Sequence, residues 1–197
     1  MHRESLDGDR LFLIHDFFTA DECQSAVDRS ERAGYEAATV ATAEGAVRIA
    51  EIRDNARLIE EDRALAETLW TRARQFLPPT VDSWRGIGLN ERFRFYRYDP
   101  GQKFAPHFDG YFERDNGERS QLTFMVYLND DFAGGETKFY GADRDRAVER
   151  VTVRPVRGMA LVFAHLQLHE GASVVQGRKY VLRTDVMYTL GVAADGR

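Results

Sequence analysis

Residues 90–98 read Asn-Glu-Arg-Phe-Arg-Phe-Tyr-Arg-Tyr, so aromatic and charged side chains alternate along this stretch. Successive side chains of a β-strand point to opposite faces, which places Phe93 and Phe95 on one face and most of the polar side chains on the other. The polar face could be solvated, or it could line an internal cavity while the phenylalanines pack under other elements. The alternation therefore predicts a strand and leaves both orientations open.

The rest of the C-terminal half has the same period of two. Turn signals rich in Gly, Pro, Asn and Asp separate successive runs. Many short strands at such spacing predict a β-sandwich or barrel, and we expect a jelly roll. The predicted strands occupy residues 88–98, 121–128, 136–140, 150–154, 159–164 and 179–189.

The N-terminal half has a helical period instead. Thr19 followed by Glu22 forms a capping box, which predicts a helix that starts after Thr19 and stops at Gly34. Apolar residues at spacings of three and four predict a second helix over residues 60–76. A short apolar run at residues 11–14 predicts a buried strand before the first helix.

Together these patterns predict one domain over residues 1–197, mainly β with N-terminal helices (α+β). Residues 1–85 are expected to form a helix-rich support, and residues 86–190 the jelly-roll core. The helices should pack on one outer face of the jelly roll, because each exposes one apolar stripe that has to be buried.

Composition excludes several classes of protein. A single cysteine, Cys23, excludes a disulfide scaffold, and we expect it to be a small buried hydrophobe. The net charge of −5 makes a nucleic-acid partner unexpected. No apolar run is long enough to span a membrane, and the polar start at residues 1–5 does not look like a secretion signal. A cytoplasmic location is therefore expected.

The few histidines suggest a metal site. His107 and Asp109 are two residues apart, so in extended backbone they point the same way. An imidazole beside a carboxylate is the start of the 2-His-1-carboxylate triad that holds Fe(II) with open coordination positions. The third ligand would come from a later strand, where both His165 and His169 follow the apolar run 159–163.

One lysine stands in an unusual place. Lys179 is one of only three lysines, and it lies ten residues after His169 in an otherwise apolar-rich strand. A buried ammonium is costly unless it is paired. A bound dicarboxylate would be such a partner.

These motifs occur in an order that resembles the prolyl 4-hydroxylase-like branch of the Fe(II)/2-oxoglutarate-dependent dioxygenases. The resemblance covers about half of the chain, and the start at residues 13–27 is also similar to that family. It implies a double-stranded β-helix fold, which is a jelly roll of the cupin-like type. The matching blocks are residues 98–109, 122–130, 134–137, 153–163, 169–171 and 177–180.

The resemblance implies that the catalytic iron ligands are His107, Asp109 and His169. His165 remains the alternative to His169, because both follow the same strand. The presence of the carboxylate at position 109 indicates hydroxylation, since related halogenases carry a small residue there that leaves room for halide.

The resemblance also assigns the 2-oxoglutarate site. Lys179 would pair with the far carboxylate, Tyr127 would donate a hydrogen bond near it, and Tyr98 would reach the near end. Arg183 shares a strand face with Lys179 and is a further candidate for co-substrate or substrate. Arg178 is the alternative to Lys179, although strand parity points it the other way.

Candidate substrate contacts are Arg92, Arg94 and Tyr96, which share the polar face of the first strand, and Thr137 in the Gly-Gly-Glu-Thr block. The polar segment 110–119 directly follows Asp109. It is expected to be either a substrate-closing lid or an ordinary hairpin loop.

The expected activity is hydroxylation of an unactivated C–H bond, with succinate and CO2 as co-products. The implied cofactors are Fe(II), 2-oxoglutarate and O2, with ascorbate as a further candidate. The substrate would be a prolyl residue in a peptide or a small amino-acid-like molecule. The alternative function is a non-catalytic cupin-like sensor that binds a metal or small acids.

Overall fold

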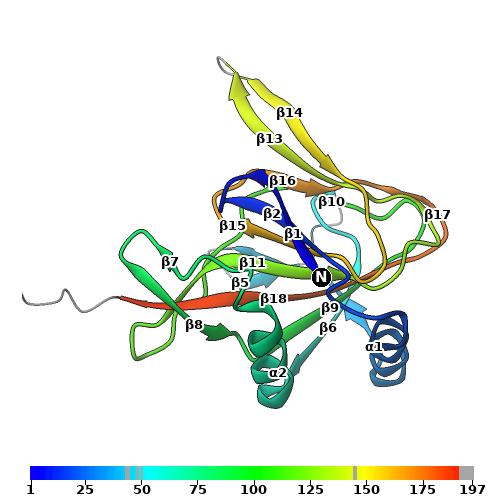
Figure 1. Cartoon of the computed structure of the whole chain (residues 1–197). Helices are drawn as coiled ribbons and strands as arrows, with labels where there is room; N and C mark the ends of the chain where they lie inside the picture. Colours follow the sequence, from blue (N-terminus) through cyan, green and yellow to red (C-terminus); the bar gives the residue numbers. More distant parts are fainter. Residues whose placement is uncertain (43–44, 48, 50, 144–145, 191–197) are drawn as a thin grey trace, which may run out of the picture.

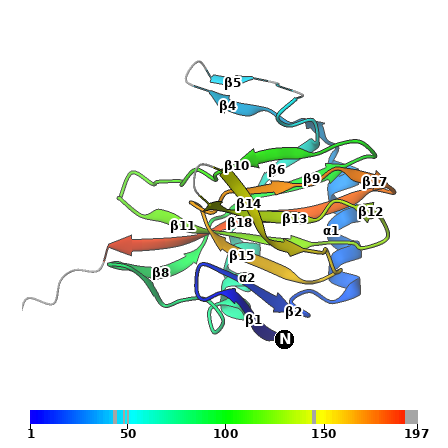
Figure 2. The same ribbon diagram turned by 90° about the horizontal axis from the view of Figure 1, so that it is seen from above.

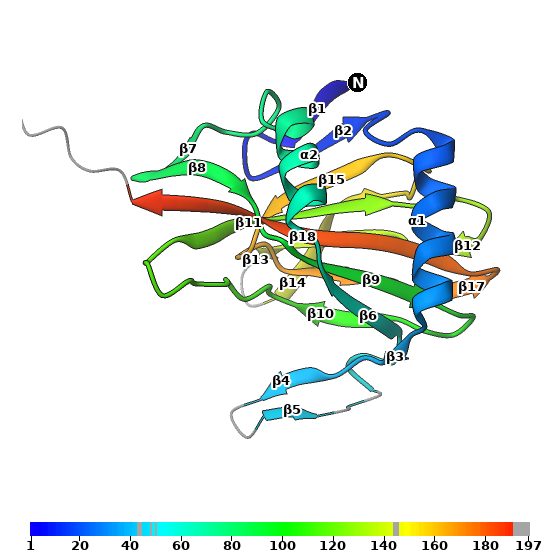
Figure 3. The same cartoon turned by 90° about the horizontal axis from the view of Figure 1, so that it is seen from below.

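The computed structural model describes residues 1–42, 45–47, 49, 51–143 and 146–190, so residues 191–197 of the predicted domain lie outside the described part. Two layers of β-sheet face each other, and the helices cover the outer face of one layer (Figures 1 and 3). This is the predicted jelly roll with helices on one outer face.

The larger layer is a ten-stranded sheet. It draws strands from both predicted parts of the chain, so residues 1–85 contribute to the same sheet as the later strands. Along the main path the order is β1 (His2–Asp7), β2 (Leu11–His15), β15 (Ala160–Ala164), β11 (Arg119–Tyr127), β18 (Lys179–Leu190), β9 (Arg92–Tyr98), β6 (Ala56–Glu61) and β3 (Glu36–Ala37). Off this path, β8 (Trp84–Leu89) pairs with β18 and with β7 (Thr80–Val81).

The smaller layer is a four-stranded sheet, and two of its strands extend away from the body as a hairpin (Figure 1). Its order is β10 (Phe104–His107), β16 (His169–Gly171), β13 (Thr137–Asp143) and β14 (Arg146–Val153). A second hairpin lies beyond the β6 edge of the main sheet (Figure 2). That hairpin is β4 (Val40–Thr42) with β5 (Gly45–Val47), and a further pair is β12 (Ala133–Gly134) with β17 (Val174–Gln176).

The first helix, α1 (Ala20–Ala33), has the predicted boundaries. The Thr19 hydroxyl accepts a hydrogen bond from the Glu22 amide at 3.1 Å, and the Glu22 carboxylate accepts one from the Thr19 amide at 2.8 Å. Gly34 ends the helix with φ of 88°, which favours glycine. Cys23 is fully buried in this helix, as predicted, and burial raises the pKa of its thiol to about 11.

The second helix, α2 (Arg63–Ala73), is shorter than predicted. The prediction that it begins at residue 60 is wrong, because Glu60 and Glu61 belong to strand β6 and pair with β9. Asp62 then caps the helix by accepting a hydrogen bond from the Leu65 amide at 2.9 Å. In the described part of the chain, neither helix is long and apolar enough to cross a membrane.

Two apolar cores lie on opposite faces of the main sheet. Phe93 and Phe95 pack in the core under the helices, together with residues of α1 and α2. Tyr96 and Tyr98 belong to the other core, between the two sheets. The polar face of β9 therefore lines the interior of the jelly roll, which settles the orientation that the alternation left open.

Candidate active site

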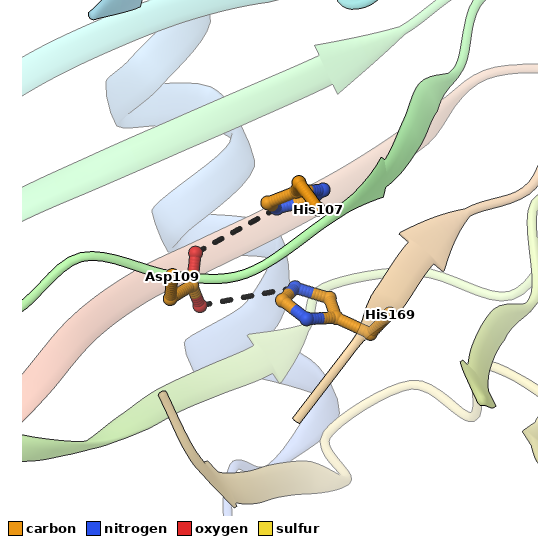
Figure 4. A group of neighbouring side chains, drawn as sticks. All are labelled: His107, Asp109 and His169. Carbon is orange, nitrogen blue, oxygen red and sulfur yellow. Dashed lines mark ion pairs between the residues drawn. The ribbon is translucent and has the colours of Figure 1, made fainter. Parts of the chain in front are cut away.

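Two neighbouring strands of the smaller sheet and the loop after β10 bring together the three predicted metal ligands. His107 ends β10 and lies opposite His169, the first residue of β16. Asp109 follows two residues later, and its amide donates to the His165 carbonyl at 3.0 Å. One ligand atom from each of His107, Asp109 and His169 lies within 4.8 Å of the others (Figure 4).

Both imidazoles are oriented by the backbone. The Nδ1 atom of His107 lies 2.8 Å from the Ala105 carbonyl, and that of His169 lies 2.9 Å from the Gln167 carbonyl. An Nδ1–H that donates to a carbonyl leaves Nε2 as the lone-pair atom, the usual arrangement for metal-ligating histidine. The Nε2 atoms face the Asp109 carboxylate at 3.6 and 3.8 Å. The Nε2 of His107 is buried and has no hydrogen-bond partner among the described residues, and a metal ion would fill that position.

The charges of the site also fit a divalent metal. Burial opposes ionisation of Asp109, but Arg183 and then the two histidines outweigh it and hold the pKa of that carboxyl well below its usual range. Burial lowers the pKa of His169 to about 4. At neutral pH the carboxylate is therefore ionised and His169 neutral, the forms in which both bind metal. Two imidazoles and one carboxylate are the donor set that suits Fe(II).

Two further side chains hold the Asp109 carboxylate in place. The Thr123 hydroxyl donates to Oδ2 at 2.6 Å, and the Arg183 guanidinium pairs with Oδ1 at 2.8 Å. Arg183 was predicted as a contact for co-substrate or substrate, and its ion pair with Asp109 was not foreseen. Thr123 was missed, although it shares the inward face of β11 with Tyr127, which was the available signal.

Lys179 is buried at one end of the same cavity, with 3% exposure. Its Nζ donates to the Gly135 carbonyl at 2.6 Å and lies 5.3 and 5.4 Å from the ring centroids of Tyr98 and Tyr127. Burial lowers the pKa of Lys179 to about 7, against a smaller opposing effect of Glu136. No carboxylate in the described part of the chain forms an ion pair with it, so an anionic ligand would be its first charged partner.

Thr137 lies at the Lys179 end of the cavity. Its hydroxyl is 2.7 Å from the hydroxyl of Tyr127, and both residues are buried. This contact favours a role beside the co-substrate over the substrate contact predicted for Thr137. Burial raises the pKa of Tyr127 and of Tyr98, so both phenols stay neutral hydrogen-bonding groups.

The structure separates the two alternatives that the sequence left open. The Arg178 side chain is 45% exposed and pairs with Asp99 at 2.6 Å, on the outside of the sheet. His165 is buried outside the triad, with Nε2 3.8 Å from a carboxylate oxygen of Asp185. These positions support Lys179 and His169 as the functional residues.

The predicted substrate contacts lie on the same interior face. Arg94 pairs with the buried Asp185 at 3.0 Å, and Arg183 lies 3.4 Å from the other oxygen of that carboxylate. Tyr96 lines the cavity, and Arg92 continues the face as a half-buried side chain.

The segment predicted as a lid or a hairpin loop is fastened at its base. Glu113 bridges to Arg119, and Arg114 pairs with both Glu91 and Glu118. These contacts favour the hairpin-loop interpretation.

Comparison with known proteins agrees with this geometry. Residues 93–184 match the family model of the 2OG-Fe(II) oxygenase superfamily. Prolyl 4-hydroxylase 1 of Arabidopsis thaliana is 25% identical over 195 residues, which cover 87% of this chain and 66% of the relative. Probable prolyl 4-hydroxylase 3 of the same plant is 23% identical over 87% of this chain and 67% of its own length. This chain thus spans about two thirds of these relatives.

Solved structures show the same fold. The viral collagen prolyl hydroxylase of Paramecium Bursaria Chlorella virus-1 has a TM-score of 0.66 at 20% identity, covering 96% of this chain and all of that one. A Pseudomonas putida prolyl-4-hydroxylase has a TM-score of 0.63 at 20% identity, covering 92% and 94% of the two chains. The match over residues 93–184, the plant relatives and the triad together support a 2-oxoglutarate- and Fe(II)-dependent oxygenase of the prolyl 4-hydroxylase-like type.

Proposed function

We propose that this protein hydroxylates an unactivated C–H bond of its substrate. The observation that carries the proposal is the combination of a His-Asp-His cluster, in which the buried Nε2 of His107 has no hydrogen-bond partner, with a buried lysine that has no carboxylate partner in the described structure. When bound, iron and 2-oxoglutarate supply oxygen activation, and the overall reaction converts substrate, 2-oxoglutarate and O2 into hydroxylated substrate, succinate and CO2.

Each residue of the site has a separate task. The triad would hold the metal through two imidazoles and one carboxylate. Thr123 and Arg183 keep the carboxylate of Asp109 in one orientation, which matters because outer partners of ligands tune metal affinity. Lys179 binds the far carboxylate of 2-oxoglutarate, and the rings of Tyr98 and Tyr127 keep water away from that ion pair.

The substrate we propose is a prolyl residue in a peptide or a small amino-acid-like molecule. This proposal is supported by the names of similar proteins, which include plant prolyl 4-hydroxylases and a viral collagen prolyl hydroxylase. A Trichoplax adhaerens prolyl hydroxylase solved with a hypoxia inducible factor peptide also shares the fold, with a TM-score of 0.66 at 16% identity.

The test is stepwise loading of the protein. Anaerobic addition of Fe(II) and then 2-oxoglutarate should produce a visible metal-to-ligand band, and admission of O2 should release succinate. Ascorbate is added in a parallel sample to see whether it sustains turnover. A correctly folded protein that gives neither band nor succinate would refute the proposal.

The same experiment separates the enzyme from the alternative sensor. A sensor would give the band but no succinate, with or without proline-containing peptides. His169→Gln is the matched negative control, because it removes one ligand from the triad while keeping a side chain of similar size.

A further inference from the structure

Three arginines share the interior face of strands β6 and β9, and a fourth, which precedes β6, stacks on Tyr96 of the same face. We call Arg53, Arg57, Arg92 and Arg94 the arginine strip. Arg92 and Arg94 share the inward face of β9 with Tyr96, and Arg57 lies opposite Tyr96 in the register of β6. On the other side of β9, Arg94 lies opposite Arg183 of the neighbouring strand β18. The strip therefore leads away from the metal ligands along the interior face.

The strip is poorly neutralised. Within the described part of the chain, only Arg94 of the four forms an ion pair, and its partner Asp185 is shared with Arg183. Glu61 lies opposite Arg92 in the register, but it is exposed and forms no ion pair there. The whole chain carries a net charge of −5, so this local excess of positive charge runs against the composition.

Arg53 provides a second, independent observation. It is only 6% exposed, and its guanidinium lies over the rings of Tyr96 and Phe104 at 4.6 and 4.4 Å. Its Nε donates to Asn55 at 2.8 Å, whereas its Nη2 is buried with no hydrogen-bond partner among the described residues. An unsatisfied buried donor on a charged group is costly, and a ligand oxygen would remove that cost.

The electrostatic consequences are visible at two neighbours. Burial, Arg53, Arg92 and Arg94 together lower the pKa of the Arg57 guanidinium. Burial by itself would raise the pKa of Tyr96, but the charges of Arg183, Arg53 and Arg94 outweigh it and lower that pKa. A hydrogen bond with Arg53 acts in the same direction, so the positive groups around this buried phenol favour its anionic form.

We propose that the arginine strip binds carboxylate groups of the substrate, so that the molecule presented to the iron is an acidic peptide segment. The inference rests on the proposed function and names its substrate class. Guanidinium groups pair with carboxylates through two parallel hydrogen bonds. Arg92 and Arg94 are two residues apart on one strand, about 7 Å, which matches the spacing of alternate side chains in an extended peptide.

Binding of designed peptides tests the proposal without turnover. The probe is the blocked peptide Glu-Ala-Glu-Pro-Glu-Ala-Glu, compared with versions that carry Gln or Lys in place of every Glu. Binding is measured by anaerobic calorimetry on protein loaded with Fe(II) and saturating 2-oxoglutarate. The Glu peptide should bind at least about tenfold more tightly than the Gln peptide at low salt, and the advantage should shrink as salt screens the charges.

Substitutions show which arginines produce the preference for the Glu peptide. Arg57→Gln and Arg92→Gln should each weaken the Glu peptide by roughly three- to tenfold and leave the Gln peptide unchanged. Arg32→Gln, in the last turn of α1 on the opposite face of the sheet, is the matched control and should change neither. Circular dichroism confirms that all three variants fold.

Two results would overturn the proposal. One is equal binding of the Glu and Gln peptides, and the other is an effect of Arg32→Gln as large as that of the strip variants. If free L-glutamate competes as strongly as the peptide, the ligand is a small acid and the proposal of a peptide substrate is wrong. Succinate release distinguishes failure of the two proposals. If no succinate is released, the proposed hydroxylase activity is wrong, but the peptide-binding measurements still test the role of the arginine strip.

Discussion

Replacing Lys179 by methionine should have opposite effects on stability and on co-substrate binding. The ammonium group is buried in the apo protein, and burial lowers its pKa from 10.5 to about 7. At 1.36 kcal/mol per pH unit, this corresponds to about 5 kcal/mol of destabilisation near neutral pH. Methionine has a similar length and no charge, so Lys179→Met removes this cost.

Part of that gain is lost with the hydrogen bond from Lys179 to the Gly135 carbonyl, which is 2.6 Å long. A buried carbonyl left without its donor costs about 1–3 kcal/mol. We therefore expect a net stabilisation of about 2–4 kcal/mol, which would raise the melting temperature of the apo protein by about 4–16 °C.

Binding of 2-oxoglutarate should change in the other direction. Removing one member of a buried ion pair leaves the other charge uncompensated, at about 3–5 kcal/mol. The affinity should therefore fall roughly 150- to 5,000-fold. The assay is an anaerobic titration of the Fe(II)-loaded protein, followed through the visible band, with thermal unfolding of the apo protein measured in parallel.

Lys138→Met is the matched control, because Lys138 is a half-exposed lysine of β13 that pairs with Glu149 outside the cavity. It should change neither quantity appreciably. Unchanged 2-oxoglutarate affinity in Lys179→Met would show that another cation binds the carboxylate. A lowered melting temperature would show that the burial argument is mistaken.

The remaining predictions concern the metal ligands and pH. Thr123→Val removes the hydrogen bond to Asp109 and should weaken Fe(II) binding about tenfold in equilibrium dialysis, and an unchanged affinity would mean that Arg183 alone positions the carboxylate. His169→Gln should abolish Fe(II) binding while His165→Gln retains it, and the reverse pattern would make His165 the ligand. Above pH 7, 2-oxoglutarate affinity should fall with rising pH, because Lys179 loses the proton that its partner requires. Between pH 7 and about 10.5 the free energy of unfolding of the apo protein should rise with pH, because the unfolded chain still binds the lysine proton that the folded chain has lost. A slope of the opposite sign in either titration, of affinity or of stability, would contradict the lowered pKa of Lys179.

Local patterns were sufficient for much of the fold. The alternation in residues 90–98 identified β9, and the capping box at Thr19 identified the start of α1. The error at the start of α2 has a physical cause: Glu60 and Glu61 pair with β9, which lies some thirty residues later in the chain. Whether a residue joins a sheet depends on a partner strand that lies elsewhere in the chain.

The candidate site was likewise predictable from the sequence only in part. The spacing of His107 and Asp109, and the order of the blocks around them, pointed to the metal ligands and to Lys179. The ion pair between Arg183 and Asp109 was not predictable, because it joins a strand and a loop that are far apart in the sequence.

The sequence by itself determined which side chains share a face, where α1 is capped, and which residue types are available for iron and a dicarboxylate. These properties follow from periods of a few residues, which are set by backbone geometry alone. Only the tertiary structure decided that His165 lies outside the triad and that the arginine strip has too few carboxylate partners. Such facts depend on the register between distant strands and on packing, which together decide which charges are buried and what lies opposite them.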